Sequence, residues 1–183
     1  MAMKTRELAE FLDTELNVEA FEDVSHNGLQ VQNTGSVKRI CCGVDASMEF
    51  FEVAADRGAD FLICHHGISW GSSLSRITDL NYDRVRFLMD QDMALYACHL
   101  PLDAHPVYGN NALICKALGI TRLKPFGWHS GMNIGFAGKL SKPTRYSAFK
   151  NKIQQVMQAA PQSMDFGKRT VSTVAVVSGG AAG

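Results

Sequence analysis

The sequence predicts a layered α/β fold, with a largely parallel sheet flanked by helices and an incomplete second α/β lobe. Strand-type and helix-type segments alternate from residue 37 to residue 119, which is typical of a parallel sheet joined by right-handed crossovers. Residues 60–64 (DFLIC) are mostly apolar, as in a strand buried on both faces. A chain of 183 residues with 46% hydrophobic residues is also long and apolar enough to bury a core.

The elements of the first lobe follow from apolar periodicity and from stop signals. Four apolar residues at helical spacing predict the first helix, namely Leu8, Phe11, Leu12 and Leu16. Gly58 and Gly119 each follow a helix-type segment and are expected to end it. The expected elements are a helix over 4–16, a strand over 37–44, a helix over 48–57, a strand over 60–64, a loop over 65–79, a helix over 80–92, a strand over 93–98, a loop over 99–108 and a helix from Asn110 or Asn111 to 118.

A second lobe is expected after Trp128, because the pattern restarts there. A strand over 132–140, a helix over 145–159 and a strand over 171–178 are predicted, which gives two domains, 1–125 and 126–183. The last strand leads directly into GGAAG. Such a turn normally continues into a helix, so we expect the second lobe to be truncated; the alternative is a frayed glycine tail.

Charge and cysteine usage exclude several classes of protein. Lys+Arg and Asp+Glu both number 18, so the basic excess of a general nucleic-acid or membrane-surface binder is missing. No apolar run approaches the roughly 20 residues of a membrane span. The five cysteines are odd in number and form no C-x-x-C pair, which favours reduced thiols in a cytoplasmic protein.

Histidines gather where the predicted strands end. His65 and His66 follow the strand over 60–64, and His99 follows the next strand, with Asp103 and His105 just beyond. Ligands of open α/β sheets bind at the carboxyl ends of the strands. Imidazole and carboxylate groups suit divalent Zn, Fe or Mn, and a His-His-Asp set suits a mono- or dinuclear hydrolytic site that activates water.

Several of the histidines, and other candidate residues near these strand ends, also have a simpler interpretation. Adjacent histidines in extended backbone point to opposite sides, so the pair would face two ions or two sides of one cavity. Asp45 is more readily explained as a cap of the following helix, and His105 as a residue that stabilises its own loop. Cys64 fits core packing, with thiolate ligation as the alternative. Trp70 either lines a pocket or packs at its rim.

Three stretches together resemble the Nif-three-like family, dinuclear-metal proteins often named GTP cyclohydrolase 1 type 2 homologues. They are HNGLQV (26–31), GADFLICHHGISWG (58–71) and YACHLPLDAHPVYGNNALICKALGI (96–120). The resemblance implies that His65, His66 and Asp103 are ligands of two divalent metal ions. His99 would then stand beside the metal site, where it is the best candidate for a catalytic proton shuttle.

The resemblance also implies a function and partners. The expected function is a metal-dependent hydrolase acting on a nucleotide-type small molecule, in a homo-oligomer that is commonly a hexamer. The alternative is a non-enzymatic protein that binds or delivers metal or acts in regulation. The family completes its site with a later GH-x-x-x-E pattern, whereas the last histidine here is His129 and the last glutamate is Glu52. We therefore expect residues 1–183 alone to bind metal weakly and to associate through an uncovered sheet edge.

Overall fold

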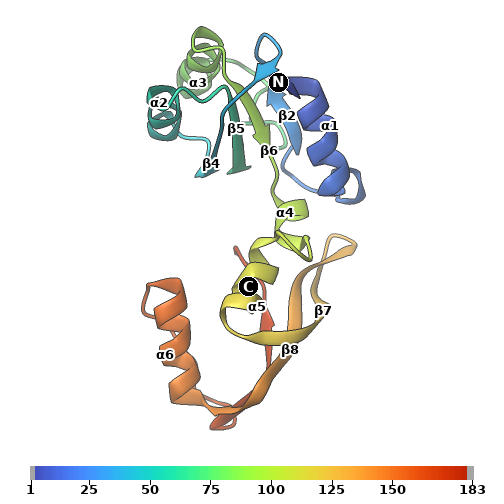
Figure 1. The fold of residues 1–183 in the computed structure, drawn as a ribbon, viewed down its shortest axis with the longest axis vertical. Coiled ribbons are helices and arrows are strands. Elements are labelled where there is room, and N and C mark those ends of the chain that lie inside the picture. The colour runs from blue at the N-terminus through green and yellow to red at the C-terminus, as the bar shows by residue number, and fades with distance from the viewer. Residues whose placement is uncertain (1–2, 181–183) are drawn as a thin grey trace. The chain divides into compact units, whose positions relative to one another are not determined.

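A computed structural model describes residues 3–180 and divides the chain into two compact units, Met1–Leu102 and Asp103–Gly183 (Figure 1). The predicted boundary after residue 125 falls inside a strand, β7 (Ile120–His129), so the structure places the boundary earlier. The reason is that β7 pairs along its length with β8 (Met132–Arg145), which assigns the whole strand to the second unit. The boundary lies within the short helix α4 (Leu100–Ala104).

The first unit contains the predicted alternation of strands and helices, together with short elements that the sequence pattern did not predict. The elements are β1 (Met3–Lys4), α1 (Thr5–Glu15), the 3-10 helix η1 (Val18–Ala20), β2 (Gly28–Val31), β3 (Ser36–Val37), β4 (Ile40–Asp45), α2 (Met48–Asp56), β5 (Phe61–His66), α3 (Asp79–Asp90) and β6 (Ala94–Ala97).

The four-stranded sheet of the first unit is mixed, which corrects the expectation of a largely parallel sheet, and β1 and β3 form a separate antiparallel pair. Its strand order is β2-β6-β5-β4. The pairs β4–β5 and β5–β6 are parallel as predicted, but β2 runs antiparallel to β6. The sequence Asn27-Gly28 indicates a turn, and in the structure Gly28, with a φ of 108°, begins this fourth strand and pairs with Ala97.

Helices cover both faces of this sheet (Figure 1). On one face, α2 and α3 pack against the sheet in a cluster that includes the fully buried Phe51 and Leu62. On the other face, α1 contributes Leu8 to a second cluster, which contains Phe61 and Tyr96. Side chains alternate between the two faces of a strand, so neighbours such as Phe61 and Leu62 serve opposite cores.

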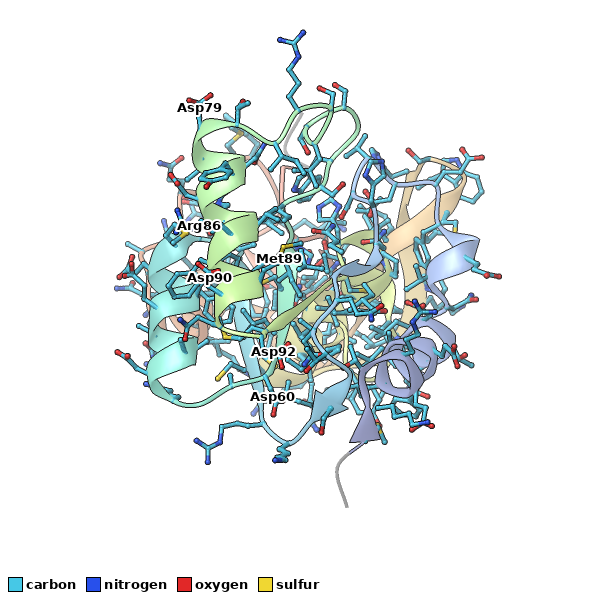
Figure 2. The ribbon with its side chains drawn as sticks, turned by 90° about the horizontal axis from the view of Figure 1, so that it is seen from above. Asp60, Asp79, Arg86, Met89, Asp90 and Asp92 are labelled. Carbon is cyan, nitrogen blue, oxygen red and sulfur yellow. The ribbon has the colours of Figure 1, made fainter. Side chains whose placement is uncertain are left out.

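Two aspartates fix the amino ends of the central strands (Figure 2). Asp60 precedes β5, and its carboxylate accepts hydrogen bonds from the backbone N–H groups of Lys38 and Arg39 at 2.9–3.1 Å. Asp92 precedes β6 and accepts bonds from the Thr34 backbone N–H at 2.7 Å and the Thr34 hydroxyl at 2.6 Å. These bonds give hydrogen-bond partners to backbone N–H groups in the connections between elements. The carboxyl ends of β5 and β6, at the opposite edge of the sheet, take no part in them.

The second unit is built on an antiparallel sheet. Its elements are α5 (Asn110–Ala117), β7, β8, α6 (Tyr146–Met157) and β9 (Thr170–Val176), and the strand order is β7-β8-β9. Cys115, Phe136 and Phe149 belong to its buried core. Among the helices of the described residues, none combines the length and the apolar character needed to cross a bilayer.

Candidate metal centre

Three histidines from two neighbouring strands come together in the first unit. His65 and His66 are the last two residues of β5, and His99 follows β6 by two residues. One ligand atom from each ring can be chosen so that all three atoms lie within 4.8 Å of one another. The ring centroids are 4.6 Å apart for His65–His66 and 5.0 Å apart for His65–His99. Because β5 and β6 are parallel neighbours, their carboxyl ends bring these rings to one place.

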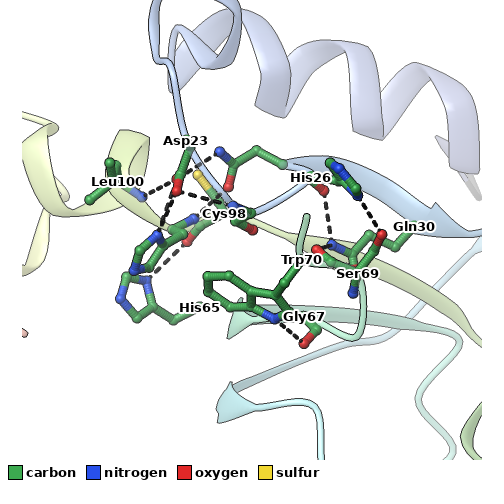
Figure 3. Close-up of polar contacts among 12 residues, drawn as sticks. Asp23, His26, Gln30, His65, Gly67, Ser69, Trp70, Cys98 and Leu100 are labelled. Atoms are coloured by element: carbon green, nitrogen blue, oxygen red, sulfur yellow. Dashed lines mark hydrogen bonds and ion pairs between the residues drawn. The ribbon is translucent and has the colours of Figure 1, made fainter. Parts of the chain in front are cut away.

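Each of the three rings is held by an oxygen atom at Nδ1. His65 Nδ1 lies 3.0 Å from the backbone carbonyl oxygen of Cys98 (Figure 3), and His66 Nδ1 lies 2.7 Å from Asp45 Oδ1. His99 Nδ1 lies 2.9 Å and 3.1 Å from the two carboxylate oxygens of Asp23. Carbonyl and carboxylate oxygens only accept hydrogen bonds. The Nδ1 atoms must therefore donate, which places the lone pair of each neutral ring on Nε2.

This arrangement is the one that metal-binding histidines use. A ligating imidazole normally donates its second N–H to a carboxylate or a carbonyl group, which fixes the tautomer and the orientation of the ring. Here all three rings carry such a partner and are partly buried. The residues present therefore fit a divalent ion such as Zn, Fe or Mn bound through Nε2 atoms.

Asp23 is held as a carboxylate by several donors (Figure 3). Burial by itself would raise the pKa of Asp23. Hydrogen bonds from His99, from Asn27 and from the backbone N–H groups of Leu100 and Ser25 outweigh burial and hold the pKa well below its usual range. The ionised carboxylate therefore accepts the hydrogen bond from His99 Nδ1 and fixes the orientation of that ring.

Asp45 has a different role from the helix cap that the sequence suggests. The cap of α2 is Ser47, whose hydroxyl accepts a hydrogen bond from the Phe50 backbone N–H at 3.2 Å. Asp45, at the end of β4, instead pairs with His66 across the parallel register. A carboxylate in this position fixes the orientation of the His66 ring.

The loop that follows the two histidines is fixed by Gln30 of β2. Gln30 Oε1 accepts hydrogen bonds from the backbone N–H groups of Ile68 (2.8 Å) and Ser69 (3.2 Å), and Gln30 Nε2 donates to the His26 carbonyl oxygen (2.8 Å). Trp70 Nε1 donates to the Gly67 carbonyl oxygen at 2.8 Å, as Figure 3 shows. The Trp70 ring lies 4.9 Å from the His99 ring and 5.6 Å from the His66 ring, so it forms one wall of the histidine cluster.

Three further candidates from the sequence each have local contacts. Asp103 lies in α4 at the start of the second unit, where its buried carboxylate accepts a bond from Asn110 Nδ2 at 2.8 Å. Cys64 is fully buried, and burial, with charges at Cys42 and Asp45 adding to it, raises its pKa to about 12, so it is a core thiol. His105 accepts bonds from backbone N–H groups within its own loop.

Sequence reasoning missed two residues that build this site, Asp23 and Gln30. Asp23 contacts a histidine 76 positions away, and Gln30 holds a loop 38 and 39 positions away. Neither residue has a local pattern of its own. The one available signal for Gln30 is its place inside HNGLQV, a stretch that carries the family resemblance but gives Gln30 no role.

Comparison with known proteins gives consistent matches over almost the whole chain. The sequence model of Duf34/NIF3 (NGG1p interacting factor 3) matches residues 3–183. A Deinococcus radiodurans protein named GTP cyclohydrolase 1 type 2 homolog is 42% identical over 177 residues, which are 97% of this chain and 67% of that protein. A relative of the same name from Archaeoglobus fulgidus is 41% identical, with coverage of 97% and 70%.

Solved structures show the same fold. The protein ybgI, described as of unknown function, superposes with a TM-score of 0.86 at 34% identity, covering 94% of this chain and 68% of that one. A Thermus thermophilus protein superposes with a TM-score of 0.84 at 32% identity, covering 93% and 68%. The fold of this chain is therefore one that is known from solved structures.

Proposed function

Because the chain belongs to the Duf34/NIF3 (NGG1p interacting factor 3) family, we propose that it binds divalent metal ions at the histidine cluster and is a metal-dependent hydrolase. The observation that carries the proposal is the convergence of His65, His66 and His99, each with its Nδ1 held by an oxygen. Surface histidines have no physical reason to share both features. A site preorganised around a cation, with histidine ligands and a further histidine beside them, explains both features.

The three histidines divide between two tasks in this proposal. His65 and His66 hold the ion through Nε2, supported by the Cys98 carbonyl group and by Asp45. His99 moves a proton between substrate and solvent, and the Asp23 carboxylate holds the His99 ring in place. A bound divalent ion would supply Lewis-acid activation of water and substrate. The ligand role of Asp103 and the binding of a second ion stay predictions.

The substrate class is proposed from the relatives. Proteins about 40% identical to this chain are named GTP cyclohydrolase 1 type 2 homolog, which makes a purine nucleotide such as GTP the first substrate to test. Hydrolysis at the imidazole ring of GTP releases formate, whereas hydrolysis of a phosphoester releases phosphate. The product therefore identifies the bond that is broken.

The test compares metal-loaded wild type with His66→Ala and with His129→Ala, a matched control at an exposed histidine of the second unit. Each protein is supplied with Zn²⁺, Mn²⁺ or Fe²⁺ and incubated with GTP or p-nitrophenyl phosphate. The proposal predicts metal-dependent release of formate or phosphate that His66→Ala abolishes and His129→Ala retains. Bound metal without turnover on either substrate would instead support a protein that binds or delivers metal. Equal metal content and activity in wild type and His66→Ala would overturn the proposal.

The role of His99 is tested separately with His99→Gln. A proton shuttle can be replaced without loss of the ion, so the variant should keep the metal content of wild type and lose most turnover, typically about 10²–10⁴-fold for a general acid or base. Loss of the metal together with activity would identify His99 as a ligand rather than a proton shuttle.

A further inference from the structure

The second unit contains two adjoining cavities, neither of which is lined by any of the three clustered histidines. Their volumes are about 560 Å³ and about 580 Å³, and both are lined by Tyr146, Asp165, Arg169 and Thr170. They lie where the start of α6 and the start of β9 meet the segment 158–169 that joins these elements. A space of this size accommodates a nucleotide-sized ligand.

The lining of these cavities is strongly cationic. Arg145, Lys150, Lys168 and Arg169 line them, against a single carboxylate, that of Asp165. The whole chain has equal numbers of acidic and basic residues, so positive charge is concentrated here. Four cations around one concave surface favour an anion by Coulomb attraction and by charge-assisted hydrogen bonds.

The amino end of α6 adds to this field. α6 has 12 residues, no acidic residue in its first turn and no side chain that caps its start. Its first backbone N–H, that of Tyr146, donates to the Arg169 carbonyl oxygen at 2.8 Å, which ties the helix start to the beginning of β9. The positive end of the helix dipole therefore faces a cavity wall that is already basic, as in anion sites at helix termini.

Hydrogen bonds fix the walls in position before any ligand arrives. The Tyr146 hydroxyl donates to Asp165 Oδ1 at 2.6 Å, and Lys150 Nζ donates to Ser163 Oγ at 2.6 Å. Both bonds attach the connecting segment to α6. Phe166, between the lining residues Asp165 and Gly167, is 92% exposed. An aromatic ring in full contact with water beside a cationic cavity is suited to stacking on a base.

We propose that these cavities form a binding site for the phosphate groups of a nucleoside triphosphate, with Phe166 beside them as a stacking surface for the base. Lys168 and Arg169 contact the phosphates, and Arg145 and the start of α6 complete the anion site. This site lies wholly within the second unit, and its binding requires neither metal nor turnover at the histidine cluster. Its test can therefore fail or succeed independently of the proposed hydrolase.

The experiment measures binding of inorganic triphosphate and of GTP by calorimetry in the presence of EDTA. Wild type should bind both ligands saturably, and the affinity should fall as NaCl is raised. Lys168→Gln/Arg169→Gln should weaken both ligands by about tenfold or more. The matched control, Lys116→Gln/Lys124→Gln, removes the same charge from exposed positions of the same unit outside the cavities and should leave both affinities within about twofold of wild type.

The other outcomes are equally decisive, provided that circular dichroism melts show each variant folded as wild type. Phe166→Ala should weaken GTP and leave triphosphate unchanged; equal binding of GTP by wild type and Phe166→Ala would overturn the stacking role. Failure of wild type to bind triphosphate, or equal losses in the two double variants, would overturn the site as a whole. Preference for a DNA oligonucleotide over GTP would assign the basic surface to nucleic acid and contradict the proposal.

Discussion

Replacing Gln30 should loosen the loop that follows His65 and His66 and carries Trp70, although Gln30 touches none of the three histidine rings in the bonds described above. Gln30→Ala removes one acceptor shared by the backbone N–H groups of Ile68 and Ser69, and one donor to the carbonyl oxygens of His26 and Ser69. A typical intramolecular hydrogen bond contributes about 0.5–1.5 kcal/mol net, and an orphaned partly buried donor costs about 1–3 kcal/mol. We therefore expect the free energy of unfolding of the first unit to fall by about 2–4 kcal/mol.

The assay is urea unfolding followed by tryptophan fluorescence in a Trp128→Phe background, so that Trp70 alone reports on the first unit. Trp70 lies in the affected loop, whereas Trp128 is an exposed residue of the second unit. Gln32→Ala is the matched control, because Gln32 is exposed and its side-chain oxygen accepts hydrogen bonds from the exposed Arg6 guanidinium at 3.2–3.3 Å. It should cost less than about 0.5 kcal/mol. If the two glutamine variants lose the same stability, the assignment of Gln30 as the support of the loop is wrong.

Three further predictions concern the surroundings of the histidines. In Gly67→Ala the new Cβ would lie 2.6 Å from the Ala97 Cβ, so overpacking should lower the free energy of unfolding by about 1–3 kcal/mol, measured by urea titration. Asp45→Asn should weaken Zn²⁺ binding by about 10–100-fold, since it removes the carboxylate that orients His66; an unchanged calorimetric affinity would contradict that role. Burial raises the pKa of Cys64 to about 12, so iodoacetamide at pH 8 should label Cys64 only after urea is added. Mass spectrometry that finds labelled Cys64 in the folded protein would contradict this prediction.

Local patterns were sufficient for the regular part of the first unit. The sequence predicts each of β4, α2, β5, α3 and β6 to within a few residues, because each has its own periodicity and its own stop signal. The ends of β5 and β6 then follow, and with them the meeting of His65, His66 and His99. Parallel neighbours make this inference possible, since their carboxyl ends share one edge.

The elements that were missed depend on contacts far along the chain or on residues that usually break structure. β2 is four residues long and begins with a glycine, and its strand character comes from pairing with β6, nearly 70 residues later. β7 contains Pro125 and Gly127, which argue against a strand, but β7 is an edge strand, where proline is tolerated. α4 contains Pro101 in its first turn, a position that a helix accepts although the segment was predicted as a loop.

The carboxylates behind the histidines could not be predicted for the same reason. Asp23 lies in a segment without regular structure, and only the folded chain brings it to His99. The position of Asp45 at a strand end favours a helix cap from sequence alone, but in the structure Ser47 caps that helix and Asp45 bonds to His66. The sequence pattern is enough to identify the candidate ligands, whereas the carboxylates that orient them are identified only from the tertiary structure.

The most direct test of the metal centre is zinc X-ray absorption spectroscopy of the chain at saturating Zn²⁺. The proposed centre predicts imidazole scattering from at least two histidines, with Zn–N distances of about 2.0–2.1 Å, and a weaker imidazole signal in His66→Ala. A coordination shell made only of oxygen atoms, or the same imidazole signal in wild type and His66→Ala, would contradict it.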